Sequence, residues 1–175
     1  MTLDTVSRAH AVGMTWLLLL SLATVAFAGC ASDWDGKAVF LPGYESSYSK
    51  LHDCRKSAHP KAAYVTTWLS PEGKATWDAY AALPAGTTGT MDFPEGTVVV
   101  KAQFDDAKCA TVIGYTAMKK LAAGADPSNG DWQWQSLTDD GQCDSHDNCD
   151  LKTECSGCHK ANPVCAATAL FCTRP

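Results

Sequence analysis

The chain lacks the features that mark nucleic-acid-binding and membrane-spanning proteins. Its 175 residues carry 14 lysines and arginines against 19 aspartates and glutamates, a formal net charge of −5, with no basic stripe. This balance argues against nucleic acid as a partner. The sequence has no internal repeat and no low-complexity tract, and its longest apolar run, residues 14–28, is short for a membrane span.

That apolar run is typical of an export signal. Arg8 precedes it, and two cleavage patterns end it. Ala26 to Ala28 fits a small-x-small site with a cut before Gly29, whereas the stretch ending at Cys30 resembles a bacterial lipobox. We therefore expect residues 1–29 to be a lipoprotein-type signal peptide and residues 30–175 to be the mature domain. The protein would be exported, to the periplasm or as an outer-membrane lipoprotein of a bacterium, where disulfides are permitted.

The number of cysteines favours the lipobox. The chain has 9 cysteines, and two of them, Cys155 and Cys158, belong to a Cys-x-x-Cys-His motif. Seven remain, which is an odd number. If Cys30 carries a lipid anchor, the other six can form disulfides, and we expect one of them to join Cys143 and Cys149 across a short polar loop.

Hydrophobic periodicity predicts an α+β fold: an antiparallel β-sheet flanked by short helices, with a C-terminal c-type haem attachment segment. Helices are expected over Tyr44 to Arg55 and from the Ser70-Pro71 pair to about Leu83. Strands are expected where β-branched and aromatic residues gather: residues 62–69, 97–104, 110–120 and 132–137.

The Cys155-Ser156-Gly157-Cys158-His159 motif matches the attachment signature of c-type haem. Two thiols at this spacing add to the two vinyl groups of the macrocycle, and the adjacent histidine coordinates the iron. Two other interpretations remain open. A redox dithiol would need a thioredoxin-like βαβ pattern, which is not apparent, and a zinc site would need a second closely spaced pair of ligands. We therefore expect one covalent haem c held by Cys155, Cys158 and His159.

The absence of methionine after His159 excludes the common arrangement in which a later methionine is the sixth iron ligand. The expected strands also argue against a four-helix haem bundle. The pattern instead indicates a β-rich haem protein with five-coordinate iron and one face open to small molecules. The alternative sixth ligands are Met91, Met118, a histidine such as His52 or His59, or a lysine, and with any of these the protein would be a plain electron carrier.

Lys101 interrupts an otherwise apolar strand. By alternation it shares one face with Thr97, Val99 and Gln103, all small or uncharged enough to line a cavity. A lysine in a strand ordinarily reaches solvent.

The order of several short motifs resembles the cytochrome P-460 family of mono-haem c-type proteins. These motifs are "LPGY", then Pro71 and Trp77, "FPEGTVVVK", "NGDWQW", "CSGCH" and a closing "ALFCT". The resemblance implies a β-rich homodimer in which Lys101 bonds covalently to the haem macrocycle. It also implies oxidation of hydroxylamine, or a similar small nitrogen compound, with electrons passed to an external acceptor such as another cytochrome.

The family's distal pocket uses a carboxylate and an arginine. The resemblance implies Asp150 as the carboxylate, with Glu154 as the alternative, because Glu154 abuts a haem cysteine. Alignment through Pro71 and Trp77 puts Val65, not an arginine, at the arginine's place. The related cytochrome c′-β proteins lack the cross-link and bind nitric oxide or similar gases, so a non-enzymatic gas binder is the alternative function.

Overall fold

The computed structural model describes residues 37–58, 62–84, 91–144, 151–166 and 172, all of them within one unit of the chain, Ser32–Pro175. Its elements, in order, are η1 (Tyr44–Ser46), β1 (Ser49–Lys56), β2 (Tyr64–Leu69), α1 (Pro71–Ala81), β3 (Val98–Phe104), β4 (Gly114–Lys120), η2 (Pro127–Asn129), β5 (Trp132–Leu137), α2 (Lys152–Ala161) and α3 (Pro163–Ala166). The expected signal peptide, residues 1–29, and Cys30 lie outside the described residues.

The five strands form one sheet in the order β1-β2-β3-β4-β5, and every neighbouring pair is antiparallel. The predicted α+β class with an antiparallel sheet and short helices is therefore confirmed. β3 lies at the centre of the sheet, and all its residues except Lys101 are buried. This position explains its run of valines, because a strand covered on both faces has no polar face to present to water.

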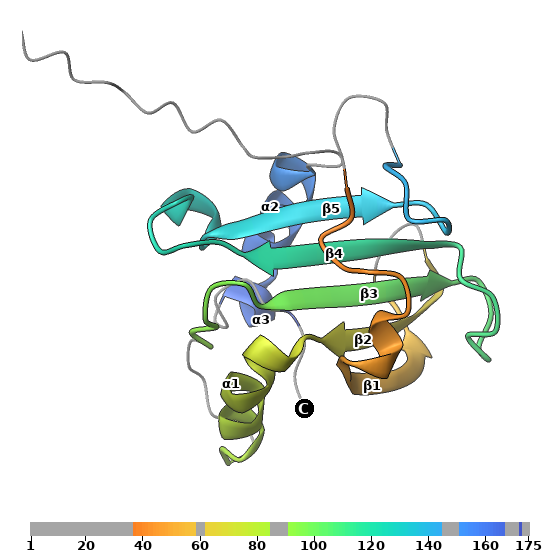
Figure 1. The fold of residues 1–175 in the computed structure, drawn as a ribbon, viewed down its shortest axis with the longest axis horizontal. Coiled ribbons are helices and arrows are strands. Elements are labelled where there is room, and N and C mark those ends of the chain that lie inside the picture. The colour runs from red at the N-terminus through yellow and green to blue at the C-terminus, as the bar shows by residue number, and fades with distance from the viewer. Residues whose placement is uncertain (1–36, 59–61, 85–90, 145–150, 167–171, 173–175) are drawn as a thin grey trace, which may run out of the picture. The chain divides into compact units, whose positions relative to one another are not determined.

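Each face of the sheet has its own hydrophobic cluster. Phe40 and Tyr44, from the segment before β1, pack on one face with Val98, Val100, Ala117 and Leu137. Figure 1 shows this orange segment crossing one face of the sheet, with α2 and α3 behind the opposite face. On that opposite face a second cluster forms around Leu69, Trp77, Met91, Phe93, Val99, Met118, Trp132 and Trp134. Cys155 of α2 packs against this second cluster.

Gln135 fastens the N-terminal segment to the sheet. Its side chain is fully buried, donates a hydrogen bond from Nε2 to the Lys37 carbonyl oxygen at 3.1 Å, and accepts one from the Val39 amide at 3.0 Å. A buried amide with donor and acceptor both used stabilises this docking without leaving an unsatisfied polar atom.

The strands expected at residues 62–69, 97–104 and 132–137 are confirmed within two residues, and the strand expected at 110–120 begins later, at Gly114. The helix expected over Tyr44 to Arg55 is wrong. Only a 3-10 turn forms there, followed by β1. β1 is an edge strand with two register shifts along β2, so its sequence has no clean alternation of polar and apolar residues. Pairing with β2 makes this segment a strand, although its local sequence favours a helix.

The helix predicted at Ser70-Pro71 is confirmed, and it ends at Ala81. Ser70 does not cap this helix with its side chain. Its Oγ instead accepts a hydrogen bond from the Val98 amide at 2.9 Å, so the residue ties the start of α1 to the start of β3.

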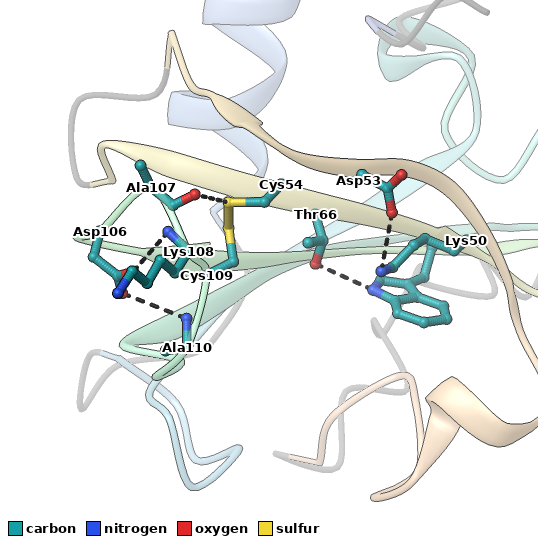
Figure 2. Close-up of a disulfide and its surroundings, with 10 residues drawn as sticks. Lys50, Asp53, Cys54, Thr66, Asp106, Ala107, Lys108, Cys109 and Ala110 are labelled. Carbon is teal, nitrogen blue, oxygen red and sulfur yellow. Dashed lines mark hydrogen bonds and ion pairs between the residues drawn. A yellow bond between two sulfur atoms is a disulfide. The ribbon is translucent and has the colours of Figure 1, made fainter.

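A disulfide between Cys54 and Cys109 joins the end of β1 to the loop after β3 (Figure 2). Asp106 organises this loop by accepting hydrogen bonds from the amides of Lys108, at 2.7 Å, and Ala110, at 3.4 Å. The bond therefore anchors the edge strand β1 beyond the pairing that it makes with β2.

Candidate functional site

A cavity of about 330 Å³ lies between the sheet and helix α2. Its sheet wall comes from β3, β4 and β5, and its other wall comes from α2 and the residue before it. The lining residues are Val99, Lys101, Thr116, Ala117, Met118, Trp134, Gln135, Ser136, Leu151, Glu154, Cys155, Cys158 and His159. We call this the helix cavity.

A second cavity of about 300 Å³ adjoins the first, because Lys101, Cys158 and His159 line both. Its other lining residues are Arg55, Lys56, Ser57, Ala58, Val65, Asn162, Cys165 and Cys172. We call this the basic cavity, since its lining includes three cationic side chains and no carboxylate. Each cavity alone is near the lower end of the 300–1,000 Å³ typical of cofactor and ligand sites, and together they fall well within that range.

Helix α2 brings the motif residues to the cavities. Cys155, Cys158 and His159 are spaced three and four residues apart, which places them on one face of a helix. Among the described cysteines, these two are the ones that form no disulfide; Cys155 is half-buried and Cys158 is exposed. The Leu151 amide donates to the Trp134 carbonyl oxygen at 3.3 Å, so the start of α2 is fixed to β5.

The far end of α2 is fixed as well. The Lys160 ammonium donates a hydrogen bond to Asn129 Oδ1 at 2.9 Å, and Asn129 belongs to the connection between β4 and β5. With both ends held on the same pair of strands, the motif residues keep a defined position over the sheet.

His159 is held between an aromatic ring and a disulfide. Its ring meets that of Trp134 edge-on, with centroids 4.6 Å apart and planes at 77°. On the other side, Nδ1 lies 3.1 Å from the Sγ of Cys172, which forms a disulfide with Cys165. The ligand atoms of His159, Cys165 and Cys172 lie within 4.8 Å of one another. The sulfurs are bonded to each other, however, and so are not the thiolates that a metal ion requires.

Lys101 lies at the middle of the central strand, paired with Thr67 on β2 and Thr116 on β4. It is half-buried and contributes to the walls of both cavities. Burial lowers the pKa of its ammonium, and the positive charge of Arg55 lowers it further, while negative charge on Cys155 and Cys158 acts in the opposite direction. A lower pKa favours the neutral amine, which carries the lone pair that a nucleophile needs.

Asp150, the carboxylate that the sequence favoured, lies outside the described residues. Glu154, the alternative, is exposed and lies at the edge of the helix cavity. It is the one carboxylate among the described residues that line either cavity.

Sequence reasoning missed Arg55. It lines the basic cavity from β1, directly opposite Val65 of β2 in the strand register. Arg55 on β1 therefore lies next to Val65 on β2, the position at which the family has its arginine. The sequence pattern does not reveal Arg55, because it predicts a helix over Tyr44 to Arg55. Arg55 lies beside Val65 only when this segment forms a strand that pairs with β2.

The alternative iron ligands occupy different places. Met118 lines the helix cavity, whereas Met91 is buried in the hydrophobic cluster and lines neither cavity. The His52 ring packs edge-on against Trp77, with centroids 6.1 Å apart, and it lines neither cavity. His59 lies outside the described residues.

The residues around the cavities fit a large, mostly apolar ligand with a few polar ends. The helix cavity has apolar walls at Val99, Ala117, Met118 and Leu151, and two thiols and an imidazole at its helix side. Trp134 Nε1 is buried and has no hydrogen-bond partner among the described residues, so it offers a donor to a polar group in the cavity. Two thiols and an imidazole on one helix face, opposite apolar walls, could hold a covalently attached haem c.

Cys143 is also disulfide-bonded, and its expected partner Cys149 lies outside the described residues. In the part of the chain that the structure describes, no helix is long and apolar enough to cross a membrane. Comparison with known proteins gives no assignment: no protein-family model and no curated protein matches the chain.

Proposed function

We propose that this protein is a mono-haem c-type cytochrome of the cytochrome P-460 type, which oxidises hydroxylamine or a similar small nitrogen compound. It would be exported, anchored through lipid on Cys30, and active as a homodimer that passes electrons to an external acceptor such as another cytochrome.

One observation carries the proposal: the cysteine-histidine motif and Lys101 line the same cavity from opposite sides, the motif from α2 and the lysine from β3. A structural disulfide motif would not need a strand lysine facing it, and a solvated lysine would not need a cavity. The joint arrangement is what attachment of a macrocycle to both walls requires.

Each residue has a separate task in this proposal. Cys155 and Cys158 would hold the haem through their thiols, and His159 would hold the iron through Nε2, because Nδ1 already contacts a sulfur atom. Lys101 is the amine that the resemblance assigns to the macrocycle, and its lowered pKa favours the neutral form. When bound, the haem supplies an iron centre that binds the small molecule and takes up its electrons.

Oxidation of hydroxylamine also releases protons, and these need an acceptor. Glu154 is the described carboxylate at the helix cavity, and its exposure gives the proton a path to solvent. Asp150, the carboxylate that the sequence favours, stays the other candidate for this role. Arg55 and Lys56 make the basic cavity electropositive, which suits an anionic group, whether a haem propionate or an anionic nitrogen product.

A non-enzymatic gas binder is the second candidate. The observation that favours it is the apolar character of the helix cavity, where Val99, Ala117, Met118 and Leu151 offer no proton acceptor. Such a wall suits a neutral diatomic ligand such as nitric oxide.

The decisive experiment is denaturing mass spectrometry of the mature protein, followed by an optical spectrum of the ferrous form. A retained haem mass, and its loss in the Cys155→Ala/Cys158→Ala variant, would establish covalent attachment. Hydroxylamine-dependent reduction of an acceptor cytochrome would then establish the enzyme. A protein that keeps no haem under conditions of c-type maturation would overturn the proposal, and a haem protein that binds nitric oxide but does not oxidise hydroxylamine would favour the gas binder.

A further inference from the structure

The contact between His159 and Cys172 fixes the position of a proton. Nδ1 of His159 lies 3.1 Å from Sγ of Cys172, and that sulfur is bonded to Cys165. A disulfide sulfur carries no hydrogen, so it can only accept. The imidazole must therefore be the donor, and the neutral ring carries its hydrogen on Nδ1. Nε2 then keeps the lone pair.

The surroundings hold the ring in this orientation. Trp134 contacts the ring edge-on, at a centroid distance of 4.6 Å. Cys165, the other half of the disulfide, is 1% exposed and lies in α3, which follows α2 directly. The disulfide thus ties the acceptor sulfur to a buried residue of the neighbouring helix, which limits how far it can move from the imidazole.

We propose that the Cys165–Cys172 disulfide is a positioning element for His159: its sulfur accepts the Nδ1 hydrogen and so leaves Nε2 as the nitrogen that binds iron. This inference rests on the proposed function for the identity of the metal, although the tautomer itself does not depend on haem. In metal sites the ring nitrogen opposite the metal usually donates to a carboxylate, a carbonyl or water. Here a disulfide takes that place.

The position of this disulfide in the sequence supports the assignment. It closes a segment with a sequence separation of 7, so it constrains the unfolded chain less than the Cys54–Cys109 bond, whose separation is 55. Cys54 and Cys109 line neither cavity, whereas Cys165 and Cys172 both line the basic cavity. Of these two bonds, the first constrains the unfolded chain more, and the second contacts the histidine.

The tautomer can be measured without haem. In the full mature chain carrying Cys155→Ser and Cys158→Ser, no haem attaches, and two-bond ¹H–¹⁵N correlation spectra of ¹⁵N-histidine show which ring nitrogen holds the hydrogen at a pH where the ring is neutral. We expect His159 to carry it on Nδ1. Adding Cys165→Ala and Cys172→Ala should remove this preference, whereas adding Cys54→Ala and Cys109→Ala, the matched control, should leave it intact.

The parent spectrum is decisive by itself, so a variant that fails to fold does not remove the test. A hydrogen on Nε2 in the parent chain overturns the proposal, as does an Nδ1 hydrogen that persists after Cys165→Ala/Cys172→Ala. If Cys165 and Cys172 are instead isolated as reduced thiols that bind zinc together with His159, the proposal is overturned in favour of a metal site.

A second readout uses the haem-loaded protein. Donation from Nδ1–H makes Nε2 a stronger donor to iron, so losing the acceptor should weaken the bond between iron and His159. In Cys165→Ala/Cys172→Ala we expect a lower iron–histidine stretching frequency, a higher reduction potential, and loss of His159 to competing ligands on the order of tenfold more readily. The Cys54→Ala/Cys109→Ala protein should match the parent.

These two readouts separate the two proposals. An Nδ1 hydrogen in a protein that never binds haem would leave the positioning role of the disulfide standing while the cytochrome assignment fails. If a haem protein is obtained but loss of the disulfide changes neither its iron–histidine bond nor its reduction potential, the cytochrome assignment stands and the positioning role of the disulfide fails.

Discussion

Arg55 and Lys101 line the same cavity from two strands, β1 and β3, that are separated by β2, and the charge of Arg55 lowers the pKa of Lys101. Two cations near each other in a half-buried site are unfavourable unless one of them gives up its proton. Lys101 is the one that can, because an arginine stays protonated in proteins. The strand register that sets Arg55 opposite Val65 is therefore also what prepares Lys101 for reaction.

The haem-free protein should gain stability when Lys101 is replaced. Since burial lowers the pKa of Lys101 in the folded state, the unfolded chain binds more protons between that pKa and about pH 10.4, and stability rises with pH across this window. Lys101→Met should raise the free energy of unfolding at pH 7 by about 1 kcal/mol, and the gain should shrink toward pH 10. Urea denaturation at several pH values measures this.

Lys119→Met is the matched control, since Lys119 lies on β4 and lines neither cavity. It should leave the pH dependence unchanged, whereas Arg55→Met should weaken the dependence that Lys101 causes. An identical pH profile for the parent and Lys101→Met would contradict the electrostatic account.

In the haem-loaded protein, Lys101→Ala should move the absorption spectrum to that of an ordinary five-coordinate c-type haem and abolish hydroxylamine oxidation. The reason is that Lys101 is the one amine among the described residues that line the helix cavity. Lys119→Ala should keep the parent spectrum. If Lys101→Ala keeps it as well, no cross-link exists, and the gas-binding function takes precedence.

The two described disulfides should differ in what their removal changes. For a separation of 55, Cys54→Ala/Cys109→Ala should lower the free energy of unfolding by about 4 kcal/mol through loss of chain constraint. For a separation of 7, Cys165→Ala/Cys172→Ala should lower it by about 2 kcal/mol. Thermal and urea unfolding give both values, and a larger loss for the short segment would contradict this order.

Gly73 should not tolerate alanine even though it lies in a helix. An added Cβ would lie 2.6 Å from Thr97 Cγ2 and 2.8 Å from Leu69 Cδ1, so either these fully buried side chains or α1 itself would have to shift. We expect Gly73→Ala to destabilise by about 1–3 kcal/mol, more than the helix propensity of alanine returns. Ala75→Gly, at an exposed position of the same helix, should cost about 1 kcal/mol. A stabilising Gly73→Ala would contradict the close packing.

Processing offers a separate prediction. Mass spectrometry of the mature protein should find lipid on Cys30 as the first residue, because the remaining cysteines outside the haem motif can then all pair. Cys30→Ala should release a form that is no longer retained by membranes. A parent protein that begins at Gly29 without lipid would favour the ordinary signal peptidase site.

Strands with a clear hydrophobic pattern, such as β3 and β5, could be predicted from the sequence, whereas the edge strand β1 could not. β3 and β5 combine β-branched or aromatic residues with clear boundaries, so their existence followed from composition alone. β1 is polar, bulged and paired on one side, so nothing local distinguishes it from a helix. Its strand character comes from its partner β2 and from the distant Cys109.

The candidate site divides in the same way. Cys155, Cys158, His159 and Lys101 could be singled out because a motif or an interrupted pattern marks each of them. Arg55 and Trp134 could not, since their contribution depends on a register and on a helix docking that no short stretch encodes. The contact between Cys172 and His159 is of the same kind, because it needs a disulfide pairing that sequence leaves undetermined.

The order of the strands has a consequence for how the protein matures. Each strand pairs with the next one along the chain, so the sheet can form by adding successive hairpins, and α2 follows the last of them. Helix α2 docks through a hydrogen bond to Trp134 of β5, which exists only when that strand is in place. If the chain is exported as proposed, the motif emerges after all five strands. Its thiols would then be within reach of a maturation enzyme after the strands that form the opposite wall of the helix cavity.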